Sequence, residues 1–177
     1  MNEATSDWEA RVAALWKRLD EMPPREFVRA VDTLAGERPE GDAFALFERA
    51  CARDSTGIED EAEKLYRAAL ATGALDDYRR TRATLQLAST LRILGQLEES
   101  ERLVTAELDR RVQAPGDYPL QDEARATLAL TYLAQGRSKE AACLALRALA
   151  PHLTRYNRSV AGNAAEFARA TTLNPAY

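Results

Sequence analysis

Histidine and cysteine are scarce in this sequence. His152 is the only histidine, and Cys51 and Cys143 are the only cysteines, among 177 residues. One histidine excludes a metalloprotease-type histidine pair, and neither cysteine has a second cysteine or histidine near it at metal-ligand spacing. We therefore expect no metal site and no disulfide framework, and we expect both cysteines to be small buried residues. His152 is expected to be structural or solvent-facing.

Long apolar runs and an excess of positive charge are also missing. Charged side chains recur every few positions, so no segment approaches the roughly 18 apolar residues of a membrane helix. The polar, acidic start MNEATSDWEA does not have the pattern of a signal peptide. We expect a cytoplasmic protein without membrane contact. The net charge of −4 provides no overall attraction to nucleic acid, which is therefore a poor candidate partner.

Glycine is limited to eight residues, and none forms a glycine-rich phosphate loop. The sequence has no nucleophile placed beside a general base, and its carboxylates gather where helices are expected to start, as at Glu59, Asp60 and Glu61. We predict no catalytic residues, no cofactor and no enzymatic activity.

A pattern of small and apolar residues occurs three times at the same internal spacing. A small residue is followed by a glycine, a second small residue and a leucine: Ala50, Gly57, Ala62 and Leu70; Ala88, Gly95, Ser100 and Leu108; Ala129, Gly136, Ala141 and Leu149. Such a copy is typical of a helix, a tight turn and a second helix. One copy cannot bury its own apolar face, so stacking of neighbouring copies must complete the core.

The rest of the chain fits this organisation as a single all-helical domain over residues 1–177. We expect an N-terminal helix pair over 6–36, in which Pro24 starts the second helix and Gly36 stops it. Three repeats follow over 42–72, 76–113 and 118–150, with Asp117 to Leu120 at the start of the third and Ser138 capping its second helix. A capping helix is expected over 156–171.

The third copy resembles the tetratricopeptide repeat family. Its matching residues are Leu128, Ala129, Tyr132, Gly136, Ala141, Ala148 and Leu149. The resemblance covers residues 42–150 and extends to the short stand-alone bacterial members, whereas Arg49 and Arg53 replace large apolar residues of the family pattern. It implies an all-α, right-handed superhelix of stacked helix-turn-helix repeats, an α-solenoid, with the N-terminal hairpin and the C-terminal helix at its ends.

The resemblance also implies a concave groove that is lined by the first helix of each repeat and binds a peptide or a partner helix. The positions that would line it are Phe47, Cys51, Asp54, Arg82, Leu85, Gln86, Ser89, Arg92, Leu130 and Leu133. Apolar residues around an arginine pair favour an amphipathic, acidic protein partner. The same two arginines could instead be ordinary solvated residues paired with nearby carboxylates.

Two other functions compete with partner binding. The chain could be a self-associating structural subunit, a homodimer rather than a monomer, if Trp8, Trp16 or the open N-terminal face is exposed. It could, with less support, be a regulator that contacts nucleic acid through arginines. Those arginines are Arg79, Arg80, Arg82, Arg110 and Arg111.

Overall fold

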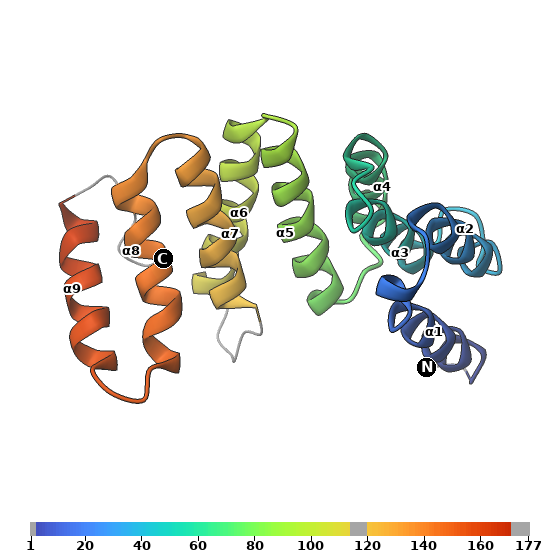
Figure 1. The fold of residues 1–177 in the computed structure, drawn as a ribbon, viewed down its shortest axis with the longest axis horizontal. Coiled ribbons are helices and arrows are strands. Elements are labelled where there is room, and N and C mark those ends of the chain that lie inside the picture. Colours follow the sequence, from blue (N-terminus) through green and yellow to red (C-terminus); the bar gives the residue numbers. More distant parts are fainter. Residues whose placement is uncertain (1–2, 114–119, 171–177) are drawn as a thin grey trace. The chain divides into compact units, whose positions relative to one another are not determined.

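The computed structural model describes residues 3–113 and 120–170, and all regular structure in those ranges is helical (Figure 1). The expected all-α class is confirmed. The elements are α1 (Glu3–Trp16), a 3₁₀ turn (Leu19–Glu21), α2 (Pro24–Ala35), α3 (Ala43–Asp54), α4 (Glu59–Ala71), α5 (Asp77–Ile93), α6 (Leu97–Gln113), α7 (Gln121–Ala134), α8 (Ser138–Leu149), a second 3₁₀ turn (Ala150–His152) and α9 (Asn157–Arg169).

Several helix ends lie where the sequence indicates. Pro24 is the first residue of α2, and Gly36 follows its last. Asp42 caps α3, because its Oδ1 accepts hydrogen bonds of 3.0 Å from two amides in the first turn. The expected cap at Ser138 is wrong: Ser138 is the first residue of α8, and the preceding Arg137 makes no side-chain capping bond. The expected start of the third repeat at 117–119, and position 171, lie outside the described residues.

The three repeated glycines form the same turn. Gly57, Gly95 and Gly136 all have φ between 76° and 79°, a region that an L side chain rarely adopts. In each turn the amide after the glycine donates to the carbonyl five residues earlier, at 2.9, 2.8 and 2.8 Å for the amides of Ile58, Gln96 and Arg137. This is the hydrogen bond of a Schellman motif, which ends one helix and reverses the chain into the next.

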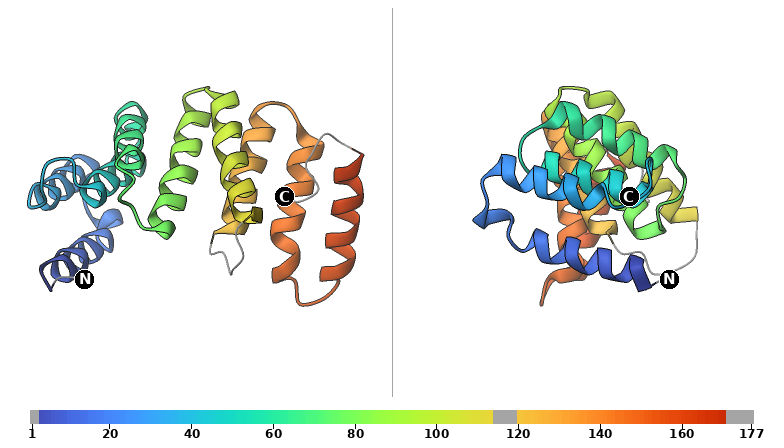
Figure 2. Two further views of the ribbon diagram at one scale, coloured as in Figure 1. Left: turned by 180° about the vertical axis from the view of Figure 1, so that it is seen from behind. Right: turned by 90° about the vertical axis from the view of Figure 1, so that its right-hand side faces the viewer.

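The chain divides into two compact units, Met1–Ala83 (unit 1) and Thr84–Tyr177 (unit 2). Helix α5 begins in unit 1 and ends in unit 2. In unit 1, contacts join α1 to α2, α2 to α3 and α3 to α4. In unit 2, α6, α7, α8 and α9 contact one another in chain order, as Figures 1 and 2 show.

Aromatic side chains organise the core of unit 1. Trp8 is only 4% exposed, and its Nε1 donates to the carbonyl of Leu34 at 2.8 Å. The prediction of an exposed Trp8 at a dimer interface is therefore wrong, because α2 covers the indole. Trp16 is half-buried and meets Phe27 edge-on with ring centroids 5.0 Å apart. The apolar cluster beneath it contains Leu15, Phe27, Val28, Val31 and Ala52.

Small and aliphatic side chains fill the core of unit 2. One buried cluster contains Leu85, Ala88, Val104, Leu108, Ala124, Leu128, Ala129, Tyr132, Ala141, Cys143, Leu144 and Ala168. Ser100 is fully buried at the position where the other copies carry alanine. Its hydroxyl donates to the carbonyl of Ala88 at 2.7 Å and lies 2.9 Å from the hydroxyl of Thr131. One hydroxyl pair thus joins α5, α6 and α7.

Candidate partner-binding face

The outward face of α7 exposes two leucines. Leu130 is 49% exposed and Leu133 is 54% exposed. They lie three residues apart, so they occupy one side of the helix, and Ala126 one turn earlier is also exposed. Leu128 and Ala124 lie on the opposite side and are buried in the core. Helix α7 therefore has an apolar stripe on each side.

The second half of α5 carries the predicted arginine. Arg92 is half-buried, donates from Nη2 to the hydroxyl of Ser89 at 3.3 Å, and keeps its Nε buried without a hydrogen-bond partner among the described residues. Gln86, nearly two turns before Arg92, is also half-buried, whereas Leu85 belongs to the core. Ile93 is 53% exposed at the end of the helix. This surface combines a cation with an exposed aliphatic side chain.

The residues predicted from α3 lie inside unit 1. Phe47 and Cys51 are fully buried, and Asp54 accepts a 3.2 Å hydrogen bond from the hydroxyl of Tyr66. Burial raises the pKa of the Cys51 thiol to about 12, against the lowering effect of its hydrogen bond with Tyr66. Helical spacing indicated which side of α3 these residues share, but the neighbouring aromatic rings that cover this side come from other segments.

Arg82 belongs to the same packed region. Its guanidinium carbon lies 5.1 Å from the ring centroid of Phe47 and 5.9 Å from that of Tyr78. These are cation–π distances, so the Arg82 side chain covers aromatic rings within unit 1.

Four of the five arginines considered for nucleic-acid binding have carboxylate partners. Arg79 pairs with Glu9 at 2.8 Å, and Arg80 pairs with Asp77 at 3.3 Å. Arg110 and Arg111 both pair with Glu107, at 2.6 and 3.0 Å, and Arg111 is buried. These contacts neutralise the charge that phosphate binding would use.

Sequence reasoning missed an ion-pair cluster that links three helices of unit 1. Arg53 of α3 is buried and donates through both terminal nitrogens to the Asp32 carboxylate of α2, each at 3.0 Å. Its Nε donates to Glu61 of α4 at 2.7 Å, and Arg49 reaches Asp32 at 2.9 Å. The available signal was two arginines at positions where the family pattern has apolar residues. An arginine that is buried at such a position requires a carboxylate partner.

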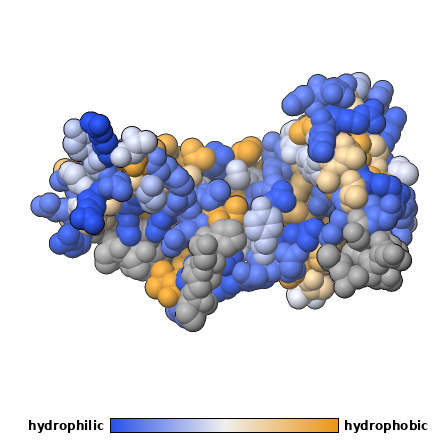
Figure 3. All heavy atoms as spheres, turned by 90° about the horizontal axis from the view of Figure 1, so that it is seen from below, coloured by the Kyte–Doolittle hydropathy of each residue, from blue (hydrophilic) through white to orange (hydrophobic). Residues whose placement is uncertain are grey.

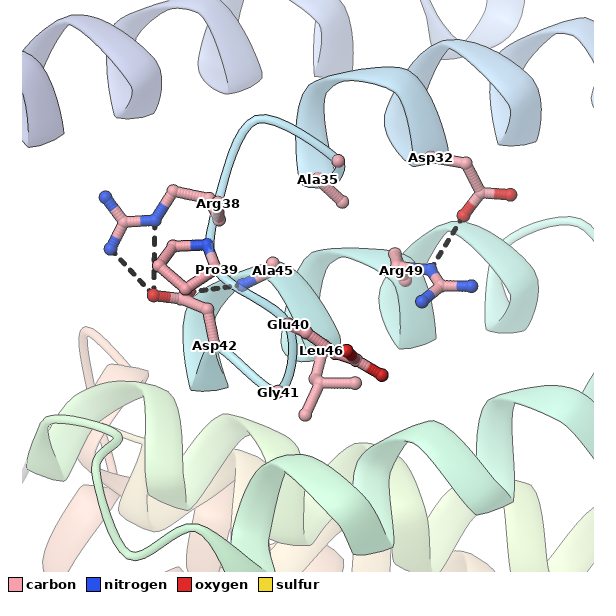
Figure 4. Close-up of a pocket in the computed structure, with 11 residues that line it drawn as sticks. Asp32, Ala35, Arg38, Pro39, Glu40, Gly41, Asp42, Ala45, Leu46 and Arg49 are labelled. Atoms are coloured by element: carbon pink, nitrogen blue, oxygen red, sulfur yellow. Dashed lines mark hydrogen bonds and ion pairs between the residues drawn. The ribbon is translucent and has the colours of Figure 1, made fainter.

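A cavity of about 500 Å³ lies beside this cluster, between α2, α3 and the segment joining them (Figure 4). Arg49 and Asp32 meet at one end, and Arg38 and Asp42 form a 2.9 Å ion pair at the other. Each cation in the view therefore faces a carboxylate. The lining arginines therefore offer no uncompensated positive charge to an anionic ligand.

Other site classes receive no support from the described part of the chain. No group of three or more histidine, cysteine, aspartate or glutamate residues there could hold a metal ion. None of the helices described is both long and apolar enough to cross a bilayer. Figure 3 shows one face of the molecule, where hydrophilic residues predominate and hydrophobic residues form small separate patches.

The helix pairs, their repeated glycine turns and the shared small-residue positions define an all-α helical repeat protein. A family model described as tetratrico peptide repeat matches residues 43–167. The chain belongs to the tetratricopeptide repeat family, and the resemblance noted in the sequence is confirmed. Repeats of this family form protein-interaction modules, which typically have no catalytic role.

Two solved structures are similar in fold. One is a crystal structure of nearly identical TPR-like repeats of a candidate kinesin light chain from Podosopora anserina, with 18% identity, a TM-score of 0.70, and coverage of 96% of this chain and 89% of that one. The other is a crystal structure of a glutamine-to-methionine variant of the same repeats, with 14% identity, a TM-score of 0.66, and coverage of 96% and 98%. Identities this low show a shared fold alone. No curated protein matches significantly.

Proposed function

We propose that this protein binds an amphipathic, acidic segment of a protein partner through the outward faces of α5 and α7 in unit 2. The exposure of Leu130 and Leu133 is the observation that carries the proposal. Two exposed leucines one turn apart on one helix leave apolar area in water, and a partner helix or peptide would remove that area from water. The proposal includes no catalysis and no cofactor, and places the protein in the cytoplasm.

Position within the repeat supports the choice of these two helices. Ala88 and Ala129 occupy the same repeat position, so Ser89 and Leu130 are equivalent residues, and Arg92 and Leu133 are equivalent as well. If 76–113 and 118–150 are successive repeats, these residues belong to one groove. In unit 1 the equivalent positions are Cys51 and Asp54, and the burial of Cys51 makes this part of α3 a poor contributor.

The charge of Arg92 favours an acidic partner. No described carboxylate forms an ion pair with its guanidinium, and its Nε has no hydrogen-bond partner in the described part of the chain. A carboxylate from a partner would supply both the acceptor and the opposite charge. Leucines on one helix and a cation on the other match a peptide whose apolar and acidic residues lie on one side.

Variants of the exposed leucines test this proposal. Leu130→Glu with Leu133→Glu should abolish co-purification of a partner from the source cells, with helical content by circular dichroism unchanged. The matched control is Leu146→Glu with Leu149→Glu, because these leucines of α8 are also 40% and 49% exposed but lie on the second helix of the pair. A photo-crosslinker at position 133 should join the same partner, and one at 146 should not. Equal partner recovery by both double variants would refute the proposal.

Self-association is the second candidate function. It is favoured by Phe167 of α9, which is 66% exposed. An exposed phenylalanine on the last described helix could pair with a second copy. Light scattering over a concentration series should then show a rising mass that Phe167→Ser returns to the monomer value. A constant monomer mass for the unmodified protein would remove this candidate.

A further inference from the structure

A cavity of about 350 Å³ in unit 2 lies where the end of α8 meets the start of α9. Three arginines from three helices line it: Arg125 of α7, Arg147 of α8 and Arg158 of α9. The other lining residues are Ala150, Pro151, Asn157 and Ala161, so no carboxylate contributes to its wall. None of the residues on the partner-binding face lines this cavity.

The positive charge around this cavity is only partly compensated. Arg125 donates from Nη1 to Asp122 at 2.6 Å. Neither Arg147 nor Arg158 forms an ion pair with a described residue, although most other arginines of the helices do. Burial and then the charge of Arg125 lower the pKa of Arg147, which agrees with two guanidinium groups placed close together. About two positive charges are left for a ligand to neutralise.

Two guanidinium nitrogens in this cluster also lack acceptors. Arg125 Nε and Arg147 Nη1 are buried and have no hydrogen-bond partner within the described residues. Buried N–H groups are nearly always paired in folded proteins, and an unpaired one on a charged group is especially unfavourable. Both residues line the same cavity, so a single acceptor-rich ligand in it could accept hydrogen bonds from both guanidinium groups.

We propose that this cavity binds a phosphate group, either as the free anion or as a monoester. A phosphate monoester carries about −1.5 to −2 charges at neutral pH and offers three acceptor oxygens. That charge matches the cations without an ion pair, and the oxygens match donors contributed by three helices. Asn157 opens the first turn of α9, where the helix dipole adds a positive potential. A carboxylate has one charge and two oxygens, and would leave a guanidinium unmatched.

Titration of the full-length protein with three probes at constant ionic strength tests the assignment. Inorganic phosphate or phosphoserine should bind at one site by calorimetry and raise the thermal midpoint, and acetate should do neither at the same concentration. Tighter binding of phosphoserine would identify an ester as the ligand, and tighter binding of inorganic phosphate would identify the free anion. Affinity for phosphoserine should fall below about pH 6, where the ester gains a proton and loses one of its two phosphate charges.

Arginine variants locate the site. Arg147→Gln should weaken phosphate binding by about tenfold or more, because it removes a charged donor, and Arg158→Gln should weaken it in the same direction. Arg158 is exposed, so its variant tests the site even if Arg147→Gln folds poorly. The matched control is Arg169→Gln, which removes the same charge from the exposed far end of α9 and should bind phosphate normally.

A stability measurement separates a binding site from a structural cluster. Without phosphate, Arg147→Gln should be at least as stable as the unmodified protein because it relieves repulsion from Arg125, and phosphate should no longer raise its thermal midpoint. Three results would each overturn the proposal: no phosphate binding by the unmodified protein, equal binding of acetate, or equal weakening by Arg169→Gln. The outcome is independent of partner binding at Leu130 and Leu133.

Discussion

The two units place different chemistry at the same repeat positions. In unit 1, Arg49 and Arg53 form ion pairs with Asp32, and Arg53 is almost entirely buried. The equivalent positions in the second copy are Leu87 and Leu91, which are buried apolar residues. One helix-pair pattern therefore accepts either a buried charge cluster or an aliphatic contact, provided that a neighbouring helix supplies a matching surface.

The difference follows from what lies beside each helix pair. In unit 1, α2 offers Asp32 to α3, so the arginines have an acceptor. In unit 2, α7 places apolar residues such as Leu128 in the shared core. A buried ion pair is costly to break but contributes little compared with apolar packing of similar volume. We therefore expect the cores to respond differently to substitution, and the tryptophans allow this to be measured because both lie in unit 1.

The largest effect is expected from the apolar core of unit 2. Leu128→Ala should lower its free energy of unfolding by about 3 kcal/mol, because it removes a fully buried side chain and leaves a cavity. Denaturant unfolding followed by far-ultraviolet circular dichroism should show this loss. Tryptophan fluorescence should show an unchanged transition for unit 1. An equal shift by both probes would mean that the two units unfold together and that their cores cannot be compared separately.

Arg53→Leu tests the charge cluster of unit 1. The variant leaves Asp32 with Arg49 alone, and we expect a loss of about 2 kcal/mol, below the cost of breaking a fully buried pair because Asp32 is partly solvated. Adding Asp32→Leu should recover most of the loss, since apolar contacts then replace the ions. Arg67→Leu, which alters a half-exposed pair with Glu63, is the control and should cost less than about 0.5 kcal/mol. The transition is read from tryptophan fluorescence.

The hydroxyl pair of unit 2 should have a smaller effect. Thr131→Val keeps the shape of the side chain but removes the hydroxyl that lies 2.9 Å from the Ser100 hydroxyl, and we expect a loss of about 1 kcal/mol. Adding Ser100→Ala to Thr131→Val should cause little further loss of stability, because neither hydroxyl of the pair is then left without its partner. A double variant as unstable as the sum of the two single variants would show that the hydroxyls do not interact.

Acidification should weaken unit 1 through Asp32. Burial raises the pKa of Asp32, but hydrogen bonds from Arg53 and Arg49 outweigh burial and hold that pKa below its ordinary value. The contribution is therefore complete above the ordinary aspartate pKa of about 3.9 and is lost as the pH falls from there through the folded-state pKa. The fluorescence-detected free energy of unfolding should fall in this range, and Arg53→Leu should reduce its pH dependence.

Glu48→Gln is expected to have the smallest effect, and of opposite sign. Burial raises the pKa of Glu48, although hydrogen bonding from Trp16 Nε1 at 2.6 Å favours the ionised form. Its ionised form is therefore unfavourable to folding at neutral pH, and the variant should be more stable there by less than about 1 kcal/mol. The difference should vanish as the pH falls through the raised pKa. A variant that is less stable at pH 7 would contradict this interpretation.

Local patterns predicted most of the fold. Apolar spacing, Pro24 and the repeated glycines are properties of short segments, so the helix pairs and their turns follow from the sequence. The prediction that Ser138 caps α8 was wrong because a serine near a helix start can be the first helical residue instead of the N-cap. The ends of individual helices depend on one or two backbone angles, which residue type alone does not determine.

The candidate site was less predictable. Leu130 and Leu133 are exposed on the side of α7 that the repeat register indicated, but Phe47 is buried because Arg82 and Tyr66 lie over it. The arginines that surround the smaller cavity come from three helices and are more than 30 residues apart at their extremes. Contacts across such separations are created by tertiary packing, and helical periodicity contains no information about them.

The burial of Cys51 and Cys143 has a practical consequence. Each unit holds one thiol, and burial raises the pKa of both, so neither should react with an alkylating reagent while its unit is closed. The rate at which each thiol is alkylated would then measure how often the unit that contains it opens. The natural sequence thus provides one thiol in each unit whose alkylation reports the opening of that unit, without any engineered probe.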